Sequence, residues 1–93
     1  MITSRHKQIM KVFSQRLKDA RERANYSSAA RFAAVLGMEP HTYRKYERGE
    51  SEPNLETLTR ICELLEITPN YLLPMAAGAR SNTSGNGQGS AAA

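Results

Sequence analysis

The sequence predicts an all-α fold, a compact bundle of five helices, for a chain of 93 residues. Apolar residues recur at the three- and four-residue spacing of helices, and the alternation typical of strands is absent. Ser, Asn, Pro and Gly stand at regular intervals where helices begin and end. Hydrophobic residues make up 40% of the chain but are sparse near its end. The globular part should therefore be roughly seventy residues, a size that is only marginally stable alone.

The first predicted helix carries one apolar stripe, made of Ile9, Met10, Phe13, Leu17, Ala20 and Ala24. Its start is open between Ser4, a suitable N-cap, and a point nearer Phe13. Residues 1–11 are accordingly either an N-terminal extension or the start of this helix. Asn25 tolerates a positive φ and is expected to end it.

The second and third predicted helices are short and closely connected. The second follows Ser27-Ser28, either of which can cap it, and stops at Gly37, the usual residue just past a helix end. The third begins with Pro40, whose ring suits the first helical position, and ends at Gly49. Three residues of connection therefore separate the two helices.

The fourth predicted helix is capped by Asn54 and buries a face of apolar residues: Leu55, Leu58, Ile61, Cys62 and Leu65. The fifth starts at Thr68-Pro69 and stops at Pro74. Residues 12–75 thus form the predicted domain. Residues 76–93, dominated by Ser, Asn, Gly, Gln and Ala, are predicted to be a disordered tail.

Charge is divided unevenly along the chain. Residues 1–48 hold eleven basic and four acidic side chains, whereas residues 49–73 hold one basic and five acidic side chains. A basic half of this kind favours a polyanionic partner, although an unevenly charged solvated surface is the alternative. The single cysteine, Cys62, excludes an internal disulfide.

Several other function classes are excluded by missing patterns. We find no paired carboxylates, nucleophile–base pair, metal-ligand spacing or phosphate loop, so no enzyme, cofactor or small-molecule substrate is expected. No apolar run approaches the length of a membrane span, and the N-terminus is not a signal peptide. We therefore expect a cytoplasmic protein without a membrane partner.

Two short helices joined through a glycine-containing turn form a helix-turn-helix. In its DNA-binding version the second helix enters the major groove, which is wide enough for one helix. Here the helix 40–48 would present one polar face, made of Pro40, His41, Arg44, Lys45 and Arg48. Tyr43, Tyr46 and Glu47 would face the domain.

Residues 13–73 resemble the Cro/cI repressor family of phages and bacteria, also called the xenobiotic-response-element family, which has the lambda-repressor-like fold. The resemblance is carried by five segments in order: Arg16-Leu17-Lys18-Asp19-Ala20-Arg21, Phe32-Ala33-Ala34-Val35-Leu36-Gly37, Tyr43-Arg44-Lys45-Tyr46-Glu47-Arg48-Gly49, Pro53-Asn54-Leu55-Glu56-Thr57-Leu58 and Ile67-Thr68-Pro69-Asn70-Tyr71-Leu72-Leu73. It implies a regulator that binds double-stranded DNA.

The resemblance also implies roles for individual residues. Base contacts would come from Pro40, His41, Arg44 and Lys45. Phosphate contacts would come from Thr42 and Arg48, and from Ser28 or Arg31 in place of a Gln that is frequent in the family. Arg21 and Glu47 would form an ion pair that fixes the angle between two helices, the alternative being a weak surface pair. The chain departs from the family where a phosphate-clamping Gln is frequent, because Ala29 stands there.

The predicted function is a dimeric repressor that occupies a pseudo-palindromic operator. Candidate residues for the contact between two copies are Tyr71, Leu72, Leu73 and Met75, which could instead seal the core. An antitoxin of the same fold, and a protein-interaction module without DNA specificity, are the competing functions.

Overall fold

The computed structural model describes residues 4–74, and these form five α-helices and no strand. The helices are α1 (Ser4–Arg23), α2 (Ala29–Leu36), α3 (Pro40–Glu47), α4 (Leu55–Leu65) and α5 (Pro69–Leu72). The predicted all-α, five-helix fold is confirmed. The predicted tail and Met75 lie outside the described residues.

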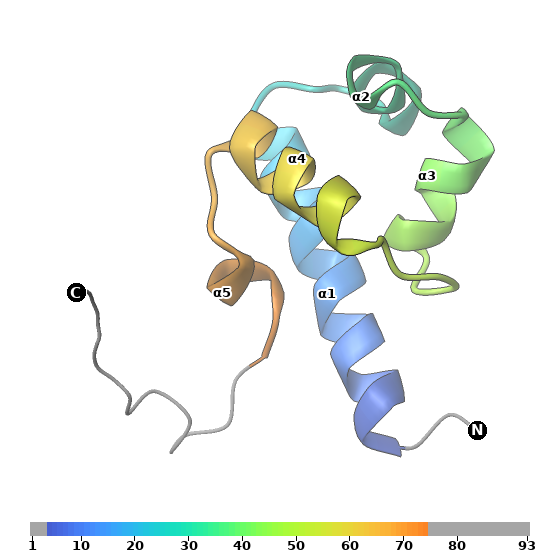
Figure 1. Ribbon diagram of the computed structural model, residues 1–93, viewed down its shortest axis with the longest axis vertical. Helices are drawn as coiled ribbons and strands as arrows, with labels where there is room; N and C mark the ends of the chain where they lie inside the picture. Colours follow the sequence, from blue (N-terminus) through green and yellow to red (C-terminus); the bar gives the residue numbers. More distant parts are fainter. Residues whose placement is uncertain (1–3, 75–93) are drawn as a thin grey trace.

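The long helix α1 is the support on which the other helices are arranged (Figure 1). Its C-terminal half packs with the remainder of the bundle, while its N-terminal half extends beyond α2 and α3. Because α1 begins at Ser4, residues 4–11 form its first turns rather than a separate extension. Asn25 follows its end with φ +70°, as predicted.

The ends of α2 and α4 follow from residues next to them. Asn54 accepts the Thr57 N–H at 2.8 Å through its side chain, which satisfies one of the free N–H groups at the start of α4. Gly37 adopts φ +78° at the end of α2. Glu66 adopts a left-handed φ of +58° at the end of α4, which the sequence did not indicate because no glycine or asparagine stands there.

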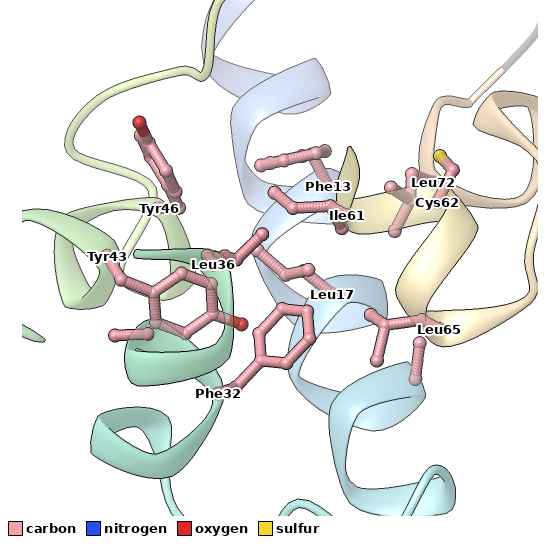
Figure 2. Packing of buried hydrophobic residues seen from close by; sticks show 12 residues of the cluster. Phe13, Leu17, Phe32, Leu36, Tyr43, Tyr46, Ile61, Cys62, Leu65 and Leu72 are labelled. Atoms are coloured by element: carbon pink, nitrogen blue, oxygen red, sulfur yellow. The ribbon is translucent and has the colours of Figure 1, made fainter. Parts of the chain in front are cut away.

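The core lies between α1, the α2–α3 pair and α4, with Leu17 and Phe32 near its centre (Figure 2). Five large side chains are fully buried: Leu17, Phe32, Tyr43, Ile61 and Leu72. The Phe32 and Tyr43 rings meet edge to face, with centroids 5.4 Å apart, and Tyr43 and Tyr46 do so at 5.9 Å. The core therefore includes both tyrosines of α3, which ties this helix to the domain.

One predicted role of an apolar residue is wrong, and the structure selects between two alternatives for another. Leu55 was expected on the buried face of α4, but it is 82% exposed, because it lies at the first position of the helix, where the chain has not yet reached the core. Leu72 was expected either to contact a second copy or to seal the core, and it is fully buried within the domain. It therefore seals the core between α1 and α4, whereas Tyr71 and Leu73 are half-buried.

None of the helices within residues 4–74 is long and apolar enough to cross a membrane. Cys62 is a free, buried cysteine, and burial raises the pKa of its thiol. Its side chain therefore packs as a small apolar group in α4.

Candidate nucleic-acid interface

The turn between α2 and α3 is closed by backbone hydrogen bonds. Gly37 N–H donates to Ala34 O at 3.1 Å, and Met38 N–H donates to Ala33 O at 3.0 Å. These two hydrogen bonds, together with the left-handed conformation of Gly37, form the motif that commonly ends a helix and turns the chain sharply. A Cβ at Gly37 would meet no atom within 4 Å, so glycine is needed there only for its φ. The turn thus sets where α3 starts relative to α2.

The helix α3 divides its side chains between the core and solvent. Tyr43 and Tyr46 are buried, while the side chains on the opposite side are exposed: His41, Arg44, Lys45 and Arg48. Pro40 and Thr42, at the start of the helix, are half-buried. Of the four residues predicted to contact bases, three are therefore exposed to solvent and Pro40 is half-buried. Guanidinium, ammonium and imidazole groups on one helix face can donate to phosphates and to base edges.

The first backbone N–H groups of α3 are used within the chain. Those of Thr42 and Tyr43 donate to Glu39 O at 3.1 Å, and Pro40 has no N–H. The side chain of Glu39, the residue before the helix, makes no hydrogen bond to the N–H groups at its start. The positive end of the helix dipole lies here, a favourable place for a phosphate oxygen.

Arg48, predicted to contact phosphate, is engaged within the chain. Its Nε and Nη2 donate to the two carboxylate oxygens of Glu50 at 3.0 and 3.1 Å. The hydrogen bond from Arg48 lowers the pKa of Glu50, and both side chains are about half exposed. These two bonds use two of the five N–H donors of the guanidinium, so the paired Arg48 keeps donors for a phosphate, although Glu50 offsets its charge.

A buried ion pair joins α3 to α1. Arg21 Nε donates to Glu47 Oε2 at 2.7 Å and Arg21 Nη2 donates to Oε1 at 3.2 Å, a bidentate pair. The side chains are 5% and 9% exposed, so this is not the weak surface pair that was the alternative. Arg21 Nη1 also donates to Tyr26 O at 2.7 Å, in the segment that leads into α2. One guanidinium thus connects α1, α3 and the start of α2.

Tyr43 completes this network by donating its hydroxyl to Glu47 Oε2 at 2.5 Å. Burial, followed by this hydrogen bond, raises the pKa of Tyr43 well above its usual value. The hydrogen bond to Glu47 likewise raises the pKa of Arg21, against the opposing effect of burial. At neutral pH Tyr43 therefore remains a neutral donor and Arg21 a cation, and Glu47 accepts from both.

Two further arginines position the helices, and the sequence did not indicate either role. Arg60 of α4 donates to Leu36 O, at the end of α2, at 2.7 Å. Arg16 of α1 donates to Tyr71 O, at α5, at 3.0 Å. The residues of each pair are 24 and 55 positions apart, so no local spacing could reveal them.

The start of α2 is arranged by Ser28, whose hydroxyl accepts the Arg31 N–H at 3.1 Å. The hydroxyl hydrogen of Ser28 is not used in that bond, and Arg31 is exposed. Ala29, at the position where Gln is frequent in the family, is half-buried. Ser28 and Arg31 thus lie together at the one end of α2 that can receive an anion.

The residues in 4–74 include no group of three or more His, Cys, Asp or Glu side chains that could hold a metal ion. The exposed side chains of α3 itself, those of His41, Arg44 and Lys45, are hydrogen-bond donors and cations, although exposed Glu39 and Glu50 flank the helix. These side chains of α3 are suited to an anionic, extended ligand.

Known proteins share this domain. The family model described as "Helix-turn-helix" matches residues 17–72. The chain is 40% identical over 62 residues to the SPbeta prophage-derived uncharacterized HTH-type transcriptional regulator YonR of Bacillus subtilis, covering 67% of the chain and 56% of that protein. It is 37% identical over 58 residues to the cryptic phage CTXphi transcriptional repressor RstR of Vibrio cholerae, covering 62% and 51%.

A third relative, the uncharacterized HTH-type transcriptional regulator YqaE of Bacillus subtilis, is 34% identical over 62 residues, covering 67% of the chain and 53% of that protein. The chain spans about half the length of these relatives. No solved structure gives a significant match.

Proposed function

Because the chain belongs to the helix-turn-helix family of the Cro/cI type, we propose that it is a transcriptional regulator that binds double-stranded DNA in a sequence-specific manner. The observation that carries this proposal is the exposed cationic face of α3, held on a helix whose other face is buried through Tyr43 and Tyr46. A helix supported in this way can enter a major groove without losing its contact with the domain.

In the proposed complex, Lys45 and Arg44 donate to guanine O6 and N7, and His41 and Pro40 contact neighbouring base edges. Ser28, Arg31 and Thr42 bind phosphate oxygens on either side of the groove, and Arg48 joins them through the N–H donors that Glu50 leaves unused. The Arg21–Glu47 pair fixes α3 against α1, so that the base contacts and phosphate contacts are made in one register.

We further propose that the protein acts as a dimeric repressor, in the cytoplasm where its operator lies. One of its relatives is named as a transcriptional repressor. Two copies of a single short reading helix bind a pseudo-palindromic site far more tightly than one, because the second helix binds as part of the same complex.

The proposal is tested by selection of duplexes from a random pool with the full chain, followed by footprinting of the enriched sequence. We expect an inverted repeat whose half-sites are about 10 base pairs apart, one helical turn. A protein that enriches no sequence, although it is folded by circular dichroism, would be a module without DNA specificity and would refute the proposal.

A further inference from the structure

A cleft of about 560 Å³ lies between the first turns of α1 and the chain that follows α3. Three basic side chains line it: Lys7 and Lys11 from α1, and Arg48 from the end of α3. They come together because the N-terminal half of α1 extends past the end of α3 (Figure 1). Arg48 also belongs to the exposed cationic face of α3, so the cleft is continuous with the face that we propose for DNA.

The two walls of the cleft meet at Gly49, where the chain leaves α3. Gly49 has a left-handed φ of +72°, and a Cβ there would lie 3.5 Å from both Met10 O and Ser14 Oγ. The backbone after α3 therefore runs directly against α1. Ser14 is buried and donates its hydroxyl to Lys11 O at 2.8 Å, which leaves the lysine side chain uninvolved. Arg48, the residue before Gly49, is thus held close to α1.

The two lysines are placed against the stability of α1 itself. Lys7 and Lys11 are four residues apart, a spacing that brings like charges together on one helix face and destabilises a helix. The first turn of α1 contains no acidic residue, although negative charge is what stabilises the start of a helix. Both lysines are exposed, and neither forms an ion pair with a carboxylate within residues 4–74. An anion bound between them would offset this repulsion.

Two carboxylates line the same cleft, and each has a partner there. Both oxygens of Glu50 accept from Arg48, at 3.0 and 3.1 Å. Glu52 Oε1 lies 3.5 Å from His6 Nε2. Lysine and arginine side chains exceed the carboxylates in the cleft by one, and the guanidinium keeps N–H donors that Glu50 does not use. The lysines of α1 therefore remain for an anion from outside the chain.

We propose that this cleft binds a phosphate of the DNA backbone next to the base pairs that α3 contacts, through Lys7, Lys11 and Arg48. The proposal rests on the proposed function as a DNA-binding protein and adds a contact surface on α1 to it. A helix in the major groove has a sugar-phosphate backbone on either side, and Arg48 joins this helix to the cleft. An acidic protein docked in the cleft would instead compete with the duplex for Arg48. The contact is independent of base sequence, because it is made to the backbone.

Fluorescence anisotropy of the full chain on the selected operator, and on a random duplex of the same length, tests the proposal. The double variant Lys7→Ala/Lys11→Ala should bind both duplexes at least about tenfold more weakly, because hydrogen bonds to a charged phosphate are lost. The slope of log K against log [salt] should become less negative by about one, as for the loss of one phosphate contact. The free energy of unfolding in urea should not fall, since the change removes a pair of like charges from α1.

The matched control is Lys18→Ala/Arg23→Ala, which removes the same charge from exposed positions of α1 outside the cleft. It should change both affinities by less than about threefold, because only screened, long-range attraction is lost. A loss as large as that of Lys7→Ala/Lys11→Ala would show that the total charge of α1 matters rather than the cleft, and would overturn the proposal.

Duplexes with single methylphosphonate groups, which lack the phosphate charge, locate the contact. The wild type should lose affinity when one particular phosphate beside the bases read by α3 is neutralised. Lys7→Ala/Lys11→Ala should lose nothing further at that phosphate, because its partner is already gone. Equal losses in the two proteins at every phosphate would overturn the assignment of the lysines to the backbone.

The outcomes separate this proposal from the function. If Lys7→Ala/Lys11→Ala binds the operator as tightly as the wild type, the cleft contact is overturned although the wild type still selects its sequence. A loss on the operator without a loss on random duplex assigns the lysines to bases and also overturns it. A wild type that selects no sequence, but whose affinity for random duplex falls in the double variant, refutes the sequence-specific function and supports the cleft contact. A wild type that binds no duplex overturns both.

Discussion

The residues that matter most for the interface fall into two kinds, according to burial. Lys45 and Arg44 are exposed to water. Arg21 and Glu47 are buried, and each is the ionic partner of the other. A buried charge that loses its partner is costly, because neither water nor another ion replaces it. Substitutions of the first kind should therefore alter binding alone, and those of the second kind should alter folding.

Lys45→Ala should weaken binding to the selected operator by about 1–3 kcal/mol and relax the preference at one base pair. The reason is that its ammonium would donate to a base edge rather than only to the backbone. Fluorescence anisotropy with the operator and with single-base variants measures both effects. Lys18→Ala, the same change at an exposed position of α1, is the control and should shift affinity by less than about twofold. An equal loss on random duplex would assign Lys45 to phosphate instead.

Arg21→Ala should lower the free energy of unfolding by about 3 kcal/mol, because it leaves the Glu47 carboxylate buried and removes the bond to Tyr26 O. Urea denaturation followed by circular dichroism measures this. Glu22→Ala is the matched control, since the Glu22 side chain is about half exposed and its carboxylate comes no nearer than 4.0 Å to the Arg21 guanidinium. Its effect should stay below about 1 kcal/mol. Similar values for both variants would show that the network contributes little.

At the scale of elements, the structure holds α3 by three kinds of contact. Its tyrosines pack into the core, its Glu47 pairs with α1, and its start is set by the closed turn after α2. Arg60 of α4 donates a hydrogen bond to the carbonyl of Leu36, the last residue of α2, so α4 also holds the residue that precedes the turn. These contacts come from three different helices, which explains how an eight-residue helix keeps a defined orientation although it is too short to be stable alone.

Gly37→Ala tests the turn. The added methyl meets no neighbouring atom, so the expected loss of about 1 kcal/mol in the free energy of unfolding comes from the left-handed φ alone. Gly37→Asn should lose less, because asparagine tolerates this conformation better. Urea denaturation of the two variants against the wild type gives both numbers. A loss in Gly37→Asn as large as that in Gly37→Ala would point to a cause other than backbone strain.

At the scale of the whole molecule, charge and apolar surface are distributed over different regions. The exposed cations of α3 face outward from one side of the bundle, and an apolar groove lies between α1 and α4. In the proposed dimeric regulator, two copies bind one operator together. The affinity for an operator should then depend on protein concentration as well as on salt.

Operator binding should weaken steeply with salt, with a slope of log K against log [salt] of about −0.9 for each phosphate neutralised. Titrations at several salt concentrations measure this slope. Removal of a phosphate contact, as in Arg31→Ala, should make the slope less negative by about one. A slope near zero would exclude DNA as the partner.

Most of the fold could be predicted from the sequence, because the signals that begin and end a helix act over a few residues. Pro40, Asn54, Asn25 and Gly37 mark helix ends by their own stereochemistry, and apolar spacing marks the buried face. The exposed face of α3 followed from the same spacing. The end of α4 could not be predicted, because Glu66 takes a conformation that its side chain does not favour.

The amino-acid order by itself determined the five helices, their approximate ends and which side of α3 turns outward, since all of these depend on neighbours within a turn or two. Only the tertiary structure decided that Leu55 is exposed, that Leu72 is buried, and that Arg60 and Arg16 hold carbonyls of distant helices. The physical reason is that burial and long-range hydrogen bonds depend on which helices meet. That choice is made by the packing of the whole bundle rather than by any one segment.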